Sequence, residues 1–175
     1  MKADLHNHSY YSDGFFSPAE VVKFAYEAGC DLFSLTDHDT TEGSSEAQVE
    51  ADKLGLELLN GVEISAFWQN MAIHIVGLGV DINNDKLVTG LAHNQELRKN
   101  RAEKIALSLW RAGIKDSLEK AQSLSKGHML TRTHFAQMLI QEGYCKDMKS
   151  VFRRYLTGKK PGGVRVDWKD FDEVI

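Results

Sequence analysis

The sequence predicts an α/β fold whose strands form a mostly parallel sheet. Short apolar runs typical of strands alternate with amphipathic helical segments through residues 1–82, and this alternation is typical of βαβ units. Metal-binding side chains stand where the predicted strands end. Residues 83–160 have helical spacing throughout, which predicts an all-helical insertion. The chain then returns to the sheet at 161–175.

The first half contains four predicted strands and two helices. Ser17-Pro18-Ala19-Glu20 predicts a helix start, because serine is a good N-cap, proline suits the first turn and glutamate can close a capping box. Gly29 fits the end of this helix. A polar helix is predicted over Gly43–Leu54. The predicted strands are Lys2–His6, Leu32–Leu35, Leu56–Ile64 and Ala72–Leu78.

The second half has an apolar stripe at helical spacing over Asn84–Ala112, with a potential break near Gly90. Its expected core contacts are Leu87, Leu91, Leu97, Ile105, Leu109 and Trp110. Further helices are predicted over Ser117–Leu124, Thr133–Gln141 and Asp147–Tyr155, and a short strand over Val164–Val166. Residues Asp167–Ile175 resemble the opening turns of an amphipathic helix. Because a closed β/α barrel needs about 250 residues, we expect the natural chain to continue.

The composition is that of a globular protein, with 42% hydrophobic and 26% charged residues among 175, which suits one domain. The formal net charge is −4, so a nucleotide or nucleic acid has to be held locally by metals and a few basic groups. Cys30 and Cys145 are expected to be free thiols, since no Cys-x-x-Cys pattern occurs. No apolar run is long enough to span a membrane, and a cytoplasmic location is expected.

Six residues with metal-binding side chains lie at or just after the ends of the first two predicted strands, near the end of the third and on the fourth. Strand ends converge on one face of a parallel sheet or barrel, and that face holds the active site. We therefore expect all six side chains to meet there. They are His6, His8, Asp13, His38, Glu63 and His74.

Imidazole nitrogens and carboxylates without thiolates suit Mn²⁺, Zn²⁺ or Fe²⁺. His6 and His8 are two residues apart along a strand, so both can bind one ion. Six ligands exceed what one catalytic ion with an open position needs, which favours at least two ions. The chemistry this predicts is metal-assisted hydrolysis.

Each residue alone has a simpler interpretation. An isolated histidine near a strand end is usually a hydrogen-bonded structural residue, and Asp13 in Ser-Asp-Gly suits a turn. Asp37 and Asp39 are either solvated loop charges or residues that orient His38. Glu63 could be a surface charge. Their joint occurrence at consecutive strand ends favours the metal site.

The sequence resembles the PHP (polymerase and histidinol phosphatase) superfamily of phosphoesterases. The matching segments are Asp4-Leu5-His6-Asn7-His8-Ser9, Ser12-Asp13-Gly14, Pro18-Ala19-Glu20, Thr36-Asp37-His38-Asp39-Thr40, Gly61-Val62-Glu63-Ile64-Ser65 and His74-Ile75-Val76-Gly77. The resemblance implies a distorted (β/α)₇ barrel with a helical insertion, in which the six residues above bind metal. It also implies a trinuclear cluster, commonly manganese, completed by three downstream ligands in motifs that these 175 residues do not contain.

The second half resembles a subgroup that hydrolyses 3′,5′-nucleoside bisphosphates and trims short RNA from the 5′ end. Matching segments are Thr131-Arg132-Thr133-His134-Phe135-Ala136, Glu142-Gly143-Tyr144, Phe152-Arg153-Arg154-Tyr155-Leu156 and Gly158-Lys159-Lys160-Pro161. This implies that Arg132 and His134 bind substrate, with Arg132 on the second phosphate. Thr133 replaces the usual proline of this element.

Alternative interpretations remain open at this stage. The protein could act on another small phosphomonoester such as histidinol phosphate, or be a non-catalytic metal-binding PHP module. Arg132 and His134 could serve only to anchor the helical insertion. Arg98 and Arg101 are expected at the surface, and Lys159 and Lys160 in a solvated turn. No membrane and no stable protein partner is expected.

Overall fold

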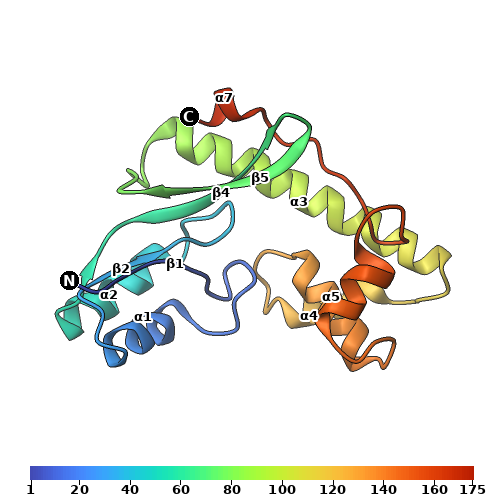
Figure 1. Ribbon diagram of the computed structural model, residues 1–175, viewed down its shortest axis with the longest axis horizontal. Coiled ribbons are helices and arrows are strands. Elements are labelled where there is room, and N and C mark those ends of the chain that lie inside the picture. The colour runs from blue at the N-terminus through green and yellow to red at the C-terminus, as the bar shows by residue number, and fades with distance from the viewer. The chain divides into compact units, whose positions relative to one another are not determined.

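The chain begins with a three-stranded parallel sheet that is built as predicted from βαβ units. The computed structural model describes residues 1–175. Strands β1 (Ala3–Asn7), β2 (Leu32–Leu35) and β3 (Glu57–Leu58) lie in the order β1-β2-β3. Figure 1 shows β1 and β2 side by side. Helix α1 (Pro18–Glu27) connects the first two strands, and α2 (Ser44–Leu54) connects the second and third.

Helix α1 begins at the predicted capping box. The Ser17 N–H donates to Glu20 Oε2 at 2.8 Å, and Ser17 Oγ accepts from the Glu20 N–H at 3.2 Å. Two of the orphan N–H groups of the first turn are thereby satisfied. Gly29 follows the helix with φ +76°, a conformation that glycine adopts without steric cost.

The helices α1 and α2 pack on the parallel sheet through a small apolar core. Buried residues of both helices and of β2 form this core, which orders the strands whose ends carry the candidate site. Its members are Val22, Ala25, Phe33, Leu35, Ala47, Ala51 and Leu56.

The third predicted strand is divided in the structure. Pairing with β2 ends at Leu58, and a new strand β4 (Gly61–Trp68) pairs antiparallel with β5 (Met71–Leu78). Gln69 and Asn70, both with positive φ, make the two-residue connection, which only an antiparallel pair permits. The expectation of a mostly parallel sheet is therefore wrong for β4 and β5.

Parallel pairing nevertheless continues from the end of β2 into the start of β4. The Glu63 N–H donates to the Asp37 carbonyl at 3.1 Å, and the Asp39 N–H donates to the Glu63 carbonyl at 2.9 Å. His38 and Glu63 thus form a parallel bridge. This backbone pairing sets the two side chains next to each other.

The apolar stripe at 84–112 forms one continuous helix, α3 (Asp85–Arg111), without a break at Gly90. Leu91, Ile105 and Leu109 are buried as expected, but Trp110 is 59% exposed. The later helices are α4 (Ser117–Leu124), α5 (Arg132–Gln141) and α6 (Met148–Val151), followed by a π-helical turn, η1 (Phe152–Leu156).

No strand forms at Val164–Val166, so that prediction is wrong. The residues that rejoin the sheet lie slightly later. The Phe67 N–H of β4 donates to the Lys169 carbonyl at 2.8 Å, and Phe67 forms a parallel bridge with Asp170. The short helix α7 (Phe171–Val174) follows and lies against β4 (Figure 1).

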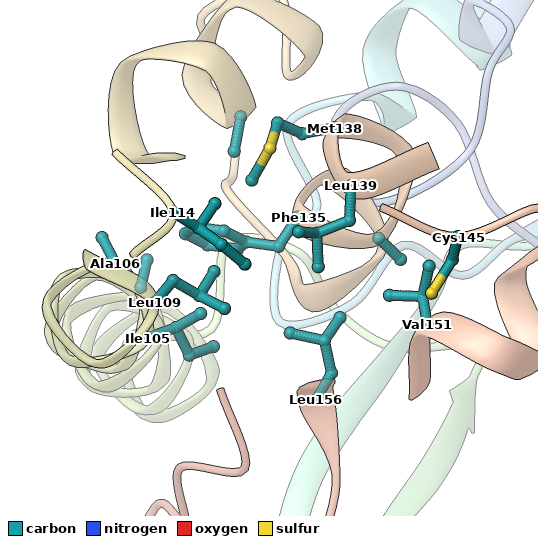
Figure 2. Packing of buried hydrophobic residues seen from close by; sticks show 13 residues of the cluster. Ile105, Ala106, Leu109, Ile114, Phe135, Met138, Leu139, Cys145, Val151 and Leu156 are labelled. Atoms are coloured by element: carbon teal, nitrogen blue, oxygen red, sulfur yellow. The ribbon is translucent and has the colours of Figure 1, made fainter. Parts of the chain in front are cut away.

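The chain forms two compact units. Unit 1 comprises Met1–Gln95 with Trp168–Ile175, and unit 2 comprises Glu96–Asp167. In unit 2, Ile105 and Leu109 of α3 pack with Phe135 and Leu139 of α5, as Figure 2 shows. The predicted organisation into 1–82, 83–160 and 161–175, and closure of the strands into a barrel, stay predictions.

Cys30 and Cys145 are both free thiols, and Cys145 is buried in the unit 2 core. None of the helices combines the length and the apolar character needed to cross a membrane.

Candidate metal centre

Glu63 is the common partner of four histidines in unit 1. Its Oε2 lies 3.0 Å from His6 Nε2, 3.0 Å from His8 Nε2 and 3.3 Å from His38 Nδ1. Its Oε1 lies 3.3 Å from His74 Nδ1. The Glu63 side chain is only 8% exposed. Four imidazoles therefore converge on one nearly buried carboxylate.

Asp13 completes the group on the other side of His8. Its carboxylate lies 3.6 Å from His8 Nδ1 and 3.9 Å from His38 Nε2. All six sequence-predicted ligands are thus brought together. Their donor atoms form three overlapping trios suited to a cation: His6, His8 and Glu63; His8, Asp13 and His38; His38, Glu63 and His74.

The local structure explains how each residue reaches the cluster. His6 lies on β1 and His8 just beyond it, so both rings point to the same side and reach Glu63 Oε2, as predicted. Asp13 lies in a tight loop where the Ser12 and Gly14 N–H groups both donate to the Ser9 carbonyl. This loop turns the carboxylate back towards His8.

Glu63 and His74 reach the cluster differently from the prediction, because neither is at the end of a parallel strand. Glu63 is the third residue of β4, and His74 lies in the middle of antiparallel β5. In the register of this pair His74 is opposite Ser65, two residues from Glu63. Diagonal neighbours on one face of an antiparallel pair are within side-chain reach.

The cluster stabilises the ionised form of Glu63. Burial favours the neutral acid, but hydrogen bonds from His74, His8 and His6 and the charge of His38 outweigh it and hold the pKa of Glu63 well below its usual range. Burial lowers the pKa of His8, yet its hydrogen bond to Glu63 and the nearby carboxylates raise the pKa overall. The centre is thus strongly attractive to positive charge.

The donor set also fits divalent metal ions. His74 Nδ1 and His38 Nδ1 face each other at 3.1 Å, and at most one of these two nitrogens can carry the shared proton. A cation accepts lone pairs from both nitrogens at once. Imidazole and carboxylate donors without sulfur are those preferred by Mn²⁺, Fe²⁺ and Zn²⁺ in open sites.

Asp37 is a buried support of this centre rather than a solvated charge. Its side chain accepts hydrogen bonds from the Ser9 N–H at 2.7 Å, from Ser9 Oγ at 2.5 Å and from Ser12 Oγ at 2.5 Å. Burial raises the pKa of the Asp37 carboxyl despite these donors. Asp37 therefore ties the loop that carries Asp13 to the strand end that carries His38.

Asp39 supports the opposite side of the centre and contacts Asn94, a residue that no sequence motif identifies. Asp39 is fully buried, and its Oδ1 accepts from Asn94 Nδ2 at 2.8 Å. The same amide donates to the Ser65 carbonyl at 2.9 Å. A detectable signal existed: Asn94 interrupts the apolar stripe of α3 between Leu91 and the positions that follow. A polar residue there predicts a buried polar contact.

Arg132 begins α5 in unit 2 and lies near Arg98 of α3. Burial, together with the positive charge of Arg98, lowers the pKa of Arg132. Arg98 and Arg101 are 3% and 7% exposed, so the expectation that they lie at the surface is wrong. They continue the apolar stripe of Ala102, Ile105 and Leu109 by one turn, which explains their burial.

His134 is 3% exposed and takes part in the cap of α5. Its Nδ1 accepts from the Thr131 N–H at 3.1 Å and contacts Thr131 Oγ1 at 3.0 Å. One ring nitrogen therefore has a structural role. The predicted role of His134 in substrate binding can rest only on the other nitrogen, Nε2, and stays a prediction.

Comparison with known proteins places these residues in context. Residues 4–168 match the PHP domain family. The chain is 42% identical over 173 residues to the 3′,5′-nucleoside bisphosphate phosphatase of Chromobacterium violaceum, covering 98% of this chain and 61% of that protein. It is 41% identical over 174 residues to the 5′-3′ exoribonuclease Rnm of Escherichia coli, covering 98% and 59%.

Solved structures share the architecture. An amidohydrolase from Chromobacterium violaceum, solved with bound sulfate and no metal, superposes with a TM-score of 0.94 at 42% identity. This match covers 99% of the present chain and 61% of the other. A protein from Bifidobacterium adolescentis shares the fold with a TM-score of 0.91 at 24% identity, covering 99% and 62%. The chain thus spans about three fifths of the relatives it matches.

Proposed function

The chain belongs to the PHP domain family, and on this premise we propose that it carries the metal centre of a phosphoesterase acting on nucleotides. The observation that carries this proposal is the convergence of four imidazoles and two carboxylates around Glu63. We also propose that the strands of unit 1 belong to a distorted (β/α)₇ barrel.

We propose that the residues of this chain hold two ions. A neutral imidazole coordinates through one nitrogen, whereas a carboxylate can use both oxygens. The four histidines, Asp13 and Glu63 therefore offer eight donor atoms at most. Two ions with three or four protein donors each would keep open positions, as catalysis needs. Glu63 belongs to two of the trios and has two carboxylate oxygens, so it could contribute a donor to each ion.

When bound, such ions would supply an activated water and would neutralise the charge on the phosphate oxygens. The protein residues keep the donors in place for this chemistry. Glu63 stays ionised, and Asp37 and Asp39 fix the segments that carry Asp13 and His38. Supporting carboxylates of this kind orient ligands and raise metal affinity. Manganese is the metal that we propose, with zinc or iron as alternatives.

The substrate class that we propose is a 3′,5′-nucleoside bisphosphate or the 5′ end of a short RNA, the 3′-phosphate being the group removed from the bisphosphate. Relatives at 42% and 41% identity bear the names of such enzymes. Within unit 2, Arg132 lies beside the buried Arg98. Two neighbouring guanidinium groups favour a phosphate dianion, which can accept hydrogen bonds from both. We propose that Arg132 and Arg98 bind the phosphate that is not hydrolysed.

Phosphate release from 3′-phosphoadenosine 5′-phosphate tests the proposal. We expect release that depends on added Mn²⁺ and that falls at least about a hundredfold in His38→Ala, because loss of a ligand costs more than loss of its support. His93→Ala is the matched control, since His93 is exposed and lies outside the cluster. Release that persists without metal, or equally in His38→Ala, would contradict the proposal.

A further inference from the structure

The charged residues of this chain are distributed very unevenly between the two units. Unit 2 contains sixteen Lys and Arg residues against seven Asp and Glu, a formal charge of +9. Unit 1 contains five against eighteen, a formal charge of −13. The two values combine to the −4 of the whole chain. The small net charge therefore conceals a strongly basic helical unit.

The exposed part of this positive charge is concentrated around α6 and η1. Six basic side chains, all exposed, lie within residues 146–160, a set that we term the α6 basic surface: Lys146, Lys149, Arg153, Arg154, Lys159 and Lys160. The one acidic residue of this stretch is Asp147, which caps α6 by accepting from the Ser150 N–H at 2.8 Å. A field of one sign on a folded surface attracts polyanions.

The backbone after η1 folds back to keep these groups together. The Gly162 N–H donates to the Tyr155 carbonyl at 2.6 Å, and the Lys160 N–H donates to the Thr157 carbonyl at 3.3 Å. A Cβ on Gly163 would lie 2.2 Å from the Gly158 carbonyl oxygen, so glycine is needed for this close approach. Lys159 and Lys160 are therefore held beside the turn that carries Arg153.

Aromatic rings lie within the same surface. The rings of Tyr144 and Tyr155 meet edge to face at 6.3 Å, and the Arg154 guanidinium lies 5.6 Å from the centre of the Tyr155 ring. Arg154 also donates to the Tyr144 carbonyl at 3.5 Å. Tyr144 is 37% exposed. Basic groups mixed with accessible aromatic rings are typical of surfaces that bind single-stranded nucleic acid.

We propose that the α6 basic surface binds the sugar-phosphate backbone of single-stranded RNA, with Tyr144 stacking on a base. This rests on the proposed function in that RNA is taken as a substrate. Six separate cations exceed what the two phosphates of a nucleoside bisphosphate can contact, so the surface fits an oligonucleotide. A single strand is favoured because its bases are free to stack on tyrosine, whereas duplex bases are not.

Binding of fluorescently labelled oligoribonucleotides, measured by anisotropy on the full chain with EDTA present, tests the proposal without catalysis. We would compare strands of about 4 and about 12 nucleotides, a range that spans typical single-strand sites. The test variant is Lys146→Gln/Lys149→Gln/Arg153→Gln. The matched control is Lys23→Gln/Lys53→Gln/Lys86→Gln, which removes the same charge from exposed lysines of unit 1.

The test variant should bind the longer strand at least about tenfold more weakly at low salt, with its salt slope reduced by about two for three lost phosphate contacts. The control variant should bind like the wild type. Equal affinity and equal salt slope in the two variants would overturn the proposal. So would binding to vesicles of phosphatidylserine and phosphatidylcholine in preference to RNA.

Hydrolysis of 3′-phosphoadenosine 5′-phosphate, measured in parallel, separates this proposal from the proposed function. The test variant should keep wild-type hydrolysis while losing RNA affinity. Absence of bisphosphate hydrolysis in the wild type would count against the proposed function, whereas RNA binding in EDTA would still support or overturn the role of the α6 basic surface.

Discussion

Asp39 and Ser65 are joined by two hydrogen bonds: Asp39 Oδ1 accepts from the Ser65 N–H at 2.8 Å, and Oδ2 accepts from Ser65 Oγ at 2.7 Å. Asp39 directly follows His38, and Ser65 lies two residues beyond Glu63 on the same face of β4. The pair therefore fixes the end of β2 against β4 from within the protein. Its position determines how His38 meets Glu63.

Asp39→Asn should weaken the metal centre without removing a ligand. The new amide nitrogen is itself a donor and would face a group whose hydrogen bond the carboxylate now accepts. The variant should therefore lose about 1–3 kcal/mol of unfolding free energy. Manganese affinity should fall about tenfold to a hundredfold. Thermal unfolding and calorimetric titration measure the two effects. Asp52→Asn, on the exposed face of α2, should change stability by less than about 0.5 kcal/mol.

Two glycines should respond to alanine in opposite directions. A Cβ on Gly14 would lie 2.3 Å from the His8 carbonyl oxygen, so Gly14→Ala must displace the Asp13 loop and should cost about 1–3 kcal/mol. Gly90 has open space around its Cβ position inside α3, so Gly90→Ala should stabilise by about 0.5–1 kcal/mol. Denaturant titration measures both effects. A Gly14→Ala variant as stable as the wild type, with unchanged metal binding, would contradict the close approach of Gly14 to the His8 carbonyl.

Two buried serines should also differ. Ser9 Oγ donates to Asp37 at 2.5 Å, so Ser9→Ala leaves a buried carboxylate short of a donor and should cost about 1–3 kcal/mol. Ser34 Oγ is buried without a hydrogen-bond partner, so Ser34→Ala removes an unsatisfied hydroxyl and should be neutral or stabilising. Thermal unfolding measures both effects. If Ser9→Ala lowered the unfolding free energy no more than Ser34→Ala does, the hydrogen bond from Ser9 to Asp37 would not contribute to stability.

Arg132→Ala and Arg98→Ala should each weaken binding of a nucleoside bisphosphate about tenfold to a hundredfold, the range for a lost charged hydrogen bond. Binding of the corresponding 3′-monophosphate should change less, because it lacks the 5′-phosphate that the two arginines are proposed to bind. Calorimetry with both ligands measures the difference. Arg111→Ala, at the exposed end of α3, is the control. An equal change for both ligands would assign the arginines a structural role.

The elements with local sequence signals were predictable. The capping box at Ser17, the strand Leu32–Leu35 and the helix Ser117–Leu124 follow from side-chain chemistry within a few residues, and the structure confirms them. The direction of β5 was not predictable from its apolar pattern, because pattern does not specify the partner strand. The two-residue Gln69-Asn70 connection between two apolar runs is the local feature of the sequence that indicates antiparallel pairing.

The sequence predicts which residues form the cluster but not the buried polar residues that hold them in place. Motifs identified the six cluster residues, whereas burial of Asp37, Asp39 and Asn94 depends on which strands and helices meet. Arg98 and Arg101 were expected at the surface because arginine usually is. Their burial follows from positions on the packing stripe of α3. The net charge of −4 does not reveal the basic surface, because it is a sum over two units of opposite charge.

Elemental analysis of the manganese content of the reconstituted chain, for the wild type and for Glu63→Gln, shows directly whether the residues around Glu63 bind metal. We expect about two ions per wild-type chain and a loss of most of them in Glu63→Gln, because Glu63 contributes to two of the three trios. A wild-type chain that binds no metal, or a Glu63→Gln chain that binds as much as the wild type, would contradict this expectation.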